Sequence, residues 1–313
     1  MSLRHASSDN FFSETHFLVW EQRPTSLSRV CGLDLPKRLV FHIKSSFTHE
    51  RVGMATPRLE FCKVTRRFAG SRRSAPVTAI EDVSLKVKDR EVVSLIGPSG
   101  CGKSTLLNLT AGLDRPSMGE IFVDGEPVKG PNSHVAFMLQ KDLLLPWRTI
   151  RENVEFGLEI RKRPAAERRE TALAALNTCR LDGFADHYPH QLSGGMRQRA
   201  ALARTMATDP TVLLMDEPFS AVDAQTKMIL QRDLSATLMR TGKTALFITH
   251  DLSEGIALSD RVLVMSKRPG RIIEEIIVDL RHREDPFARR NHPRMGEYMT
   301  RLSELLDLAH AEV

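Results

Sequence analysis

Residues 91–104 decide the fold and read Glu91-Val-Val-Ser-Leu-Ile-Gly-Pro-Ser-Gly-Cys-Gly-Lys-Ser104. The short apolar run Glu91–Ile96 predicts a strand that is buried on both faces. A glycine-rich loop follows at once, and residues from Lys103 to about Ala111 predict a helix. Strand, loop and helix in this order are typical of a parallel sheet covered by helices, so the sequence predicts an α/β fold.

The loop between this strand and this helix matches the phosphate-binding pattern G-x-x-x-x-G-K-[ST]. Glycines let backbone N–H groups turn inward around phosphate oxygens, and the helix dipole adds partial positive charge at the same place. We expect Lys103 to reach the β- and γ-phosphates of a nucleotide and the Ser104 hydroxyl to bind Mg²⁺. The residues expected to contact the nucleotide here are Gly97, Pro98, Ser99, Gly100, Cys101, Gly102, Lys103, Ser104 and Thr105.

A second buried strand is predicted over Thr211–Met215, and it ends in two carboxylates, Asp216 and Glu217. Because adjacent residues of a strand point to opposite faces, we expect the two acids to hold different roles. Asp216 is assigned to the metal ion, and Glu217 is assigned to the attacking water as general base.

The run Leu192-Ser-Gly-Gly-Met-Arg-Gln-Arg199 completes a series of motifs that resembles an ATP-binding cassette (ABC) ATPase. The resemblance covers roughly residues 58–270. The family's other marks stand in order: Phe68, where an aromatic ring stacks on adenine, the phosphate loop, Gln140 of the Q-loop, Asp216-Glu217, Ser220–Asp223 as the D-loop, and His250 as the switch histidine. The resemblance implies ATP hydrolysis with ATP and Mg²⁺. It places Ser104, Gln140 and Asp216 around the metal, and Lys103, Glu217 and His250 in catalysis.

A second anion-binding helix start is predicted at Ser193, Gly194 and Gly195. As in the phosphate loop, small residues at the start of a helix offer N–H donors to an anion. The chain already has one phosphate loop, so this second cradle is expected to close on the ATP of a partner chain. The resemblance implies a head-to-tail homodimer with two ATP molecules at its interface. Asp223 is expected to contact the partner chain's nucleotide together with Ser193–Gly195.

The fold that the resemblance implies is a P-loop NTPase with a RecA-like parallel-sheet core, an antiparallel β subdomain and a helical subdomain. Strand patterns over Leu59–Val64 and Ala79–Val87, and a hairpin turning at Asp124-Gly125, predict the antiparallel sheet. Helix formers predict a helical subdomain at about residues 142–207. Its helices are expected at Ile150–Ile160, Ala165–Cys179 and Met196–Ala207.

The parallel sheet is expected to continue with strands at Thr244–Thr249 and Arg261–Met265, separated by helices. Residues 271–313 form a C-terminal extension with a strand at Ile272–Asp279 and an amphipathic helix around Met295–Ala309. Residues 1–57 show no sustained period and are left unassigned. Two alternatives remain open for them: translation starts at Met54, or the first 53 residues form a flexible extension.

Composition narrows the class of protein. The 313 residues are 41% hydrophobic and 27% charged, which is typical of a globular chain, and no apolar run is long enough to span a membrane. The formal net charge is +6, but the basic runs are scattered and interrupted by acids, so no nucleic-acid partner is expected.

The four cysteines form no Cys-x-x-Cys pair, which argues against a zinc site or a disulfide framework. Cys101 has two interpretations, a packing role, which we favour, and a reactive thiol beside Lys103.

The segment after Gln140, Lys141–Val154, resembles the ATPases of nitrate, sulfonate and taurine importers. This resemblance implies a peripheral subunit on the cytoplasmic face of the bacterial inner membrane. It would energise uptake through a separate membrane permease, expected to be a dimer, that is served by an extracytoplasmic solute-binding protein. Leu143, Leu144, Leu145 and Trp147 are candidates for the permease-docking surface or for core positions. Two alternatives stay open, a soluble ABC ATPase acting on ribosomes or DNA and an exporter, and the cargo is not specified.

Overall fold

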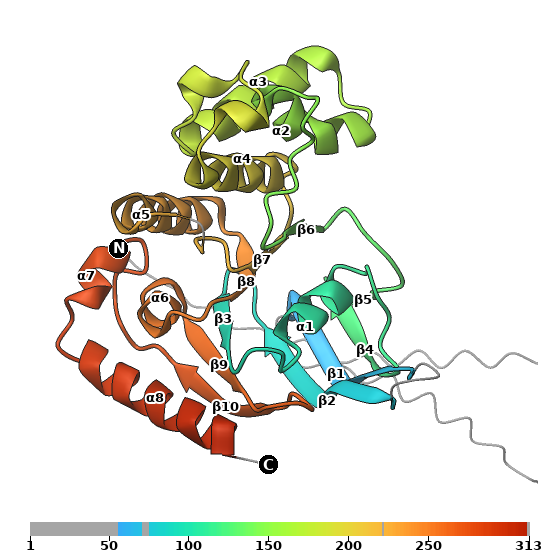
Figure 1. Ribbon diagram of the computed structural model, residues 1–313, viewed down its shortest axis with the longest axis vertical. Helices are drawn as coiled ribbons and strands as arrows, with labels where there is room; N and C mark the ends of the chain where they lie inside the picture. Colours follow the sequence, from blue (N-terminus) through green and yellow to red (C-terminus); the bar gives the residue numbers. More distant parts are fainter. Residues whose placement is uncertain (1–55, 71–74, 221, 312–313) are drawn as a thin grey trace, which may run out of the picture. The chain divides into compact units, whose positions relative to one another are not determined.

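The computed structural model describes residues 56–70, 75–220 and 222–311 (Figure 1). Both alternatives for the start of the chain concern residues outside these ranges, so they stay predictions. The boundaries predicted for the domains likewise stay predictions. Two sheets and a group of helices make up the described part.

The larger sheet has six strands in the order β10-β9-β3-β8-β7-β6. Their bounds are β3 (Val92–Ile96), β6 (Val135–Met138), β7 (Val212–Asp216), β8 (Thr244–Ile248), β9 (Arg261–Met265) and β10 (Ile272–Ile277). All neighbouring pairs from β9 to β6 are parallel, and β10 runs antiparallel to β9. Every residue of β3, β7 and β8 is buried, which explains their continuous apolar sequences.

The smaller sheet is antiparallel, with the order β2-β1-β4-β5. It consists of β1 (Leu59–Phe68), β2 (Val77–Val87), β4 (Met118–Val123) and β5 (Glu126–Pro127). The predicted hairpin turn is confirmed, because Asp124 and Gly125 both have positive φ angles, 53° and 79°. Strand β1 extends four residues beyond its predicted end and so carries Phe68 to the edge of the nucleotide pocket described below.

Helices α2 (Ile150–Ile160), α3 (Ala165–Thr178) and α4 (Gly194–Ala207) pack against one another and form the group at the top of Figure 1. The predicted bounds of α2 are confirmed. Thr149 fixes its start through a capping box, in which Glu152 N donates to Thr149 Oγ1 and Thr149 N donates to Glu152 Oε2. Helix α4 begins two residues before its predicted start, because Ser193 caps it.

The remaining helices accompany the larger sheet. They are α1 (Lys103–Thr110), α5 (Ala224–Thr241), α6 (Leu252–Leu258), α7 (Pro286–Arg290) and α8 (Met295–Ala311), with short 3₁₀ helices η1 (Asp182–Phe184) and η2 (Pro189–Gln191) elsewhere. Strand β6 and helix α7 were not predicted. Both are only four or five residues long, too short for periodicity to detect.

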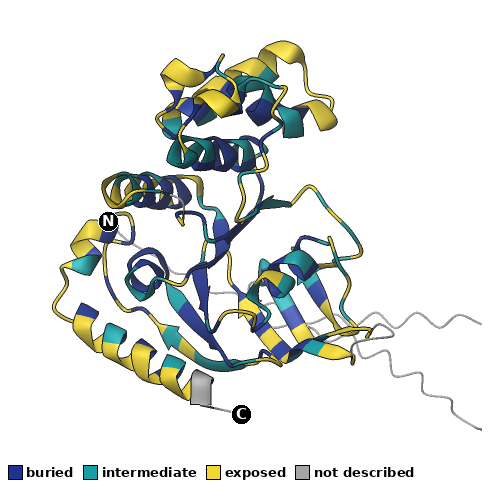
Figure 2. Cartoon of the chain, viewed as in Figure 1, coloured by how far each residue is buried: buried dark blue, intermediate teal, exposed yellow. Residues whose placement is uncertain are grey.

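The C-terminal residues contribute to the packed core. Leu302 and Leu305 of α8 lie in one apolar cluster with Val262 and Val264 of β9. Figure 2 shows buried and exposed residues interspersed along α8. Strand β10 adds an edge to the six-stranded sheet. Residues 272–309 therefore share the core of the parallel sheet, although their sequence lies beyond the last recognised motif.

Candidate nucleotide-binding site

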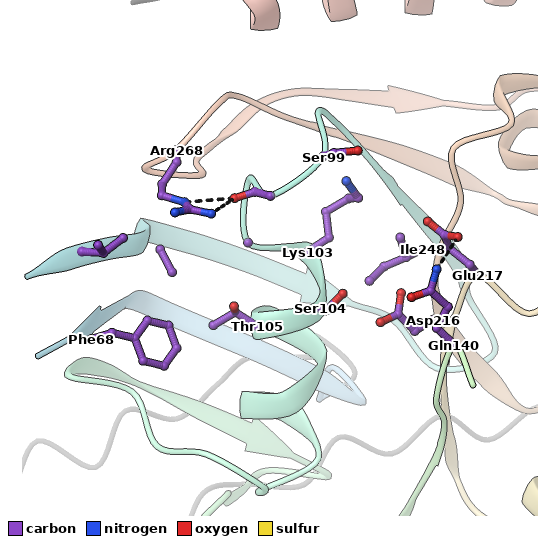
Figure 3. A pocket seen from close by; sticks show the side chains of 14 residues that line it. Phe68, Ser99, Lys103, Ser104, Thr105, Gln140, Asp216, Glu217, Ile248 and Arg268 are labelled. Atoms are coloured by element: carbon purple, nitrogen blue, oxygen red, sulfur yellow. Dashed lines mark hydrogen bonds between the residues drawn. The ribbon is translucent and has the colours of Figure 1, made fainter. Parts of the chain in front are cut away.

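One pocket of about 320 Å³ gathers most of the residues that the sequence motifs single out (Figure 3). It lies where the phosphate loop meets the ends of β1, β7 and β8. Its lining consists of Phe68, Val77, Ala79, Ser99, Gly100, Gly102, Lys103, Ser104, Thr105, Gln140, Asp216, Glu217, Ile248 and Arg268. The chain thus brings together residues from seven separate stretches of sequence.

The backbone of the phosphate loop favours glycine at positions 100 and 102, and position 102 also has no room for a Cβ. Gly100 has φ +76° and Gly102 has φ +108°, angles that residues with a Cβ rarely adopt. A Cβ on Gly102 would also lie 2.5 Å from Ile80 Cγ2 and 2.8 Å from Ala79 O. The loop can therefore come this close to β2 only with glycine at 102.

Lys103 fills the inside of this loop. Its Nζ donates to Gly97 O at 2.7 Å and to Pro98 O at 2.9 Å. These two carbonyls hold the ammonium group at the mouth of α1, where the helix dipole is also positive. The result is a concentrated positive charge beside the backbone N–H groups that open the helix, which suits a phosphate chain.

Asp216 is the buried acid of the site, 7% exposed at the end of β7. Burial raises the pKa of its carboxyl, and a hydrogen bond from Ser104 together with the charge of Lys103 opposes that rise. Asp216 and Ser104 therefore interact in the same pocket, although they are far apart in the sequence.

The expectation that Asp216 and Glu217 point to opposite faces of the sheet is wrong, because both line the same pocket. Strand β7 ends at Asp216, and Glu217 has a left-handed backbone with φ 48°. Alternation of side chains holds only for extended residues, so the turn at Glu217 brings the second carboxylate back to the pocket. A non-glycine residue with such a φ angle at a pocket is a form of strain often found at functional sites.

Glu217 is held by two side chains from other loops. Gln140 Nε2 donates to Glu217 Oε2 at 3.0 Å, and His250 Nδ1 lies 3.5 Å from Glu217 Oε1. His250 does not line the pocket itself and is largely exposed. The predicted Q-loop, general base and switch histidine thus form one contiguous group.

Phe68 lines the edge of the pocket and is 40% exposed, so part of its ring is accessible to a ligand. The guanidinium of Arg66 lies 4.6 Å from the ring centroid. This contact is a cation–π interaction, which restrains the ring at the pocket edge.

Several predicted residues lie outside this pocket. Gly97, Pro98 and Cys101 belong to the loop but are not part of the lining, and neither are the signature residues 193–195 and Asp223. Ser193 Oγ accepts from Met196 N at 3.3 Å, and Asp223 Oδ1 accepts from Thr226 N at 3.0 Å. Within one chain, these two residues serve as helix caps of α4 and α5.

Cys101 is buried, and burial raises the pKa of its thiol against the opposing effect of Lys103. The thiolate that a reactive cysteine needs is therefore disfavoured. The structure supports the packing role that the sequence analysis prefers.

Arg268 lines the pocket and was missed by the sequence analysis, as were Val77, Ala79 and Ile248. Arg268 precedes Pro269-Gly270, a dipeptide that signals a turn. Nothing in the local sequence tells which distant loop such a turn contacts.

The side chains at the pocket fit a magnesium ion. Ser104 and Asp216 offer a hydroxyl and a carboxylate, and Gln140 adds an amide oxygen, all of them hard oxygen donors of the kind Mg²⁺ prefers. The described residues contain no cluster of three or more His, Cys, Asp or Glu that could hold a metal ion. A site with few protein ligands is normal for Mg²⁺, which takes its remaining ligands from phosphates and water.

The sequence of an uncharacterized ABC transporter ATP-binding protein of Methanocaldococcus jannaschii is 48% identical over 218 residues, which cover 70% of this chain and 80% of that protein. This chain belongs to the ABC transporter family. The family described as ABC transporter matches residues 80–220, which include the phosphate loop and Asp216-Glu217. The fold is that of an ABC ATPase, and the protein is an ATP-hydrolysing cassette of this family, as the sequence analysis predicted.

Other members of the ABC family are also similar to the chain. The taurine import ATP-binding protein TauB of Yersinia pestis is 46% identical over 66% of this chain and 80% of its own length. The nitrate import ATP-binding protein NrtD of Synechocystis is 42% identical over 79% of this chain and 94% of its own length. The resemblance to this group of ABC proteins is confirmed.

A solved ABC cassette, described as a dimer in a post-hydrolysis state bound to ADP and Pi, superposes on this chain with a TM-score of 0.64. The two sequences are 32% identical, and the match covers 70% of this chain and 98% of that cassette. A second dimeric structure of a bacterial ABC transporter cassette gives a TM-score of 0.65. Among the helices of the described ranges, none is both long and apolar enough to cross a membrane.

Proposed function

We propose that this chain is the ATP-hydrolysing subunit of an ABC importer that takes up a small nitrate-, sulfonate- or taurine-like solute. The observation that carries the proposal is the shared pocket of the phosphate loop, Asp216 and Glu217. The relatives named as taurine and nitrate import proteins support the direction of transport and the class of cargo.

In this proposal, the phosphate loop binds the nucleotide and Lys103 neutralises the β- and γ-phosphates. Phe68 stacks on the adenine ring. Ser104, Asp216 and Gln140 hold Mg²⁺, which supplies positive charge against the charge that develops on the phosphates.

Glu217 takes the proton of the attacking water. Its two neighbours suit that role, since Gln140 orients one carboxylate oxygen and His250 lies beside the other. His250 is exposed and therefore accessible to a γ-phosphate at the open side of the pocket.

The functional unit proposed here is a head-to-tail homodimer. Ser193, Gly194 and Gly195 begin helix α4 with N–H groups that have no acceptor in the first turn, yet they do not reach the pocket of their own chain. In the dimer, the nucleotide bound in the phosphate loop of the second chain lies against the start of this helix. The dimeric cassettes with a similar fold support this arrangement.

Leu143 and Trp147, in the segment after Gln140, are proposed to dock on a membrane permease. This contact would hold the subunit on the cytoplasmic face of the membrane. Trp147 is 72% exposed and Leu143 is 54% exposed, whereas Leu144 is 8% exposed and packs in the core of the helical group. Large exposed apolar side chains close together in sequence are typical of an interaction site. Since Gln140 contacts Glu217, this segment is also placed to sense the state of the catalytic base.

The test is a pull-down of tagged Glu217→Gln protein with MgATP from detergent-solubilised membranes of the source organism, with partners identified by mass spectrometry. Lys103→Ala protein under the same conditions is the matched control, because it should neither bind MgATP nor close a dimer. A co-purifying multispanning permease supports the importer, and its associated solute-binding protein can be screened with nitrate, alkyl sulfonates and taurine. Recovery of ribosomal or DNA-repair proteins in place of a permease would refute transport.

A further inference from the structure

Arg268 contacts the phosphate loop from outside. Its Nε donates to Gly100 O at 3.0 Å, and its Nη2 donates to the same oxygen at 2.8 Å (Figure 3). The two residues lie 168 positions apart in the sequence. Lys103 binds the carbonyls of Gly97 and Pro98 from inside the loop, so the two cations hold different carbonyls from different sides.

Arg268 stands on a turn that is itself fixed. We call residues 266–271, between β9 and β10, the support turn. Ser266 N donates to Arg271 O at 3.0 Å and closes it. Gly270 N donates to Ala79 O at 2.9 Å, and Glu81 N donates to Gly270 O at 3.0 Å, so the turn is bonded to β2.

The support turn also touches the phosphate loop through its backbone. A Cβ on Gly270 would lie only 2.0 Å from Cys101 O, which shows how closely the two backbones approach. The guanidinium of Arg268 is therefore presented from a rigid base beside the loop, although its side chain is exposed.

The bonds to Gly100 O determine where the next N–H group points. A peptide unit is planar and trans, so its C=O and N–H point in opposite directions. With Gly100 O held toward Arg268, Cys101 N–H points away from Arg268 and into the loop, 3.4 Å from Pro98 O. This hydrogen bond is long and therefore weak, so a phosphate oxygen can replace Pro98 O as the acceptor.

Gly100 makes such a restraint necessary. Gly100 has φ +76° and no Cβ, and without a Cβ its backbone can adopt more conformations than that of other residues. A loop that samples several peptide orientations must lose that freedom on binding, which weakens affinity. An external donor that fixes one orientation removes part of this cost.

We propose that Arg268 is a positioning residue that orients the Gly100–Cys101 peptide for the phosphate chain of a nucleoside di- or triphosphate. The proposal rests on the proposed nucleotide site. It differs from a direct contact between Arg268 and the ligand, because positioning acts on the loop before any nucleotide binds.

The test compares Arg268→Met and Arg268→Gln with wild type in two measurements. The first is amide hydrogen exchange of the phosphate-loop peptide in nucleotide-free protein, where Arg268→Met should exchange about tenfold faster. The second is affinity for MgADP and MgATP, which should fall about tenfold, equivalent to ~1.4 kcal/mol, while kcat stays within about twofold. Arg268→Gln keeps an N–H donor without the charge and should recover part of both losses.

Lys267→Met is the matched control, because it removes one positive charge from the same turn. The hydrogen bonds of the described residues join no side-chain atom of Lys267 to the phosphate loop, so this variant should behave like wild type. Unchanged loop exchange in Arg268→Met, or unchanged nucleotide affinity, overturns the proposal. If Arg268→Gln and Arg268→Met lose nucleotide affinity equally and hydrogen exchange of the phosphate loop is unchanged in both, Arg268 acts instead through a direct charge contact with the nucleotide. Failure of the wild-type protein to bind either nucleotide would refute the nucleotide site itself, and the exchange data would still report on the loop.

Discussion

Lys227 Nζ lies 2.9 Å from Asp251 Oδ2 and 2.8 Å from Glu254 Oε2. Lys227 lies in the first turn of α5, the helix that begins directly after the D-loop residue Asp223. Asp251 directly follows His250. Burial raises the pKa of the Asp251 carboxyl, but hydrogen bonds from Lys227, Ser253 and Glu254 N outweigh it and bring the pKa to about 2. This ion pair ties the segment that should meet a partner chain to the segment that carries the switch histidine.

Loss of this ion pair should destabilise the protein in a pH-dependent way. Lys227→Met should lower the free energy of unfolding by roughly 2 kcal/mol at pH 7, because the buried Glu254 and half-buried Asp251 lose their cation. The pKa of Asp251 lies below its ordinary value of 3.8, so its contribution is fully present above about pH 4 and disappears as the pH falls through 2. Urea denaturation at pH 7 and pH 3 measures the difference between variant and wild type.

The control for this prediction is Lys141→Met, which removes a charge from an exposed side chain and should change stability by less than about 0.5 kcal/mol. A loss in Lys227→Met that is equal at pH 7 and pH 3 would contradict the prediction, because it would show that neither Asp251 nor Glu254 acts on Lys227 through its charge.

Glu217→Gln should abolish turnover while keeping nucleotide binding. The amide keeps the size of the side chain and its place beside Gln140 but cannot accept the proton of water, so kcat should fall by roughly 10²–10⁴. Light scattering with MgATP should show a dimer that persists, because hydrolysis no longer separates the two chains. ATP turnover by Glu217→Gln at the wild-type rate would contradict the assignment of Glu217 as the general base.

Lys103→Ala should lose nucleotide binding without loss of the fold. Within the described ranges, the Nζ group donates to Gly97 O and Pro98 O and weakly to Cys101 Sγ. The melting temperature of the nucleotide-free protein should therefore change by no more than a few degrees. Addition of MgATP should stabilise wild type and leave the variant unchanged. A full MgATP-induced shift in the variant would contradict the role assigned to Lys103.

Trp147→Ala and Leu144→Ala should separate docking from core packing. Trp147 is exposed, so its removal should cost less than about 0.5 kcal/mol of stability and leave the ATPase rate of the isolated subunit unchanged, but it should prevent recovery of the permease. Leu144 is buried, so its truncation should cost about 2–4 kcal/mol. Denaturation curves and the pull-down together check the pair, and permease recovery with Trp147→Ala equal to wild type would exclude Trp147 from the docking surface.

The sequence determined the local parts of this protein. The apolar run of β3, the glycines at 100 and 102 and the lysine at 103 are neighbours along the chain, and strand, loop and helix N-terminus follow from their short-range geometry. The turn at Asp124-Gly125 and the start of α2 at Thr149 were predictable for the same reason, because hairpin and cap preferences act over a few residues.

Only the tertiary structure decided which distant groups meet. Arg268 reaches Gly100 because β9 lies beside β3 in the sheet, an order that the sequence does not state. Glu217 turns into the pocket because its backbone leaves the strand. Leu144 is buried next to the exposed Leu143 because other residues of the core pack against it. Such contacts depend on the topology of the chain, because folding brings together residues that are far apart in sequence. A local sequence pattern identifies a functional residue but does not show which distant residue it contacts.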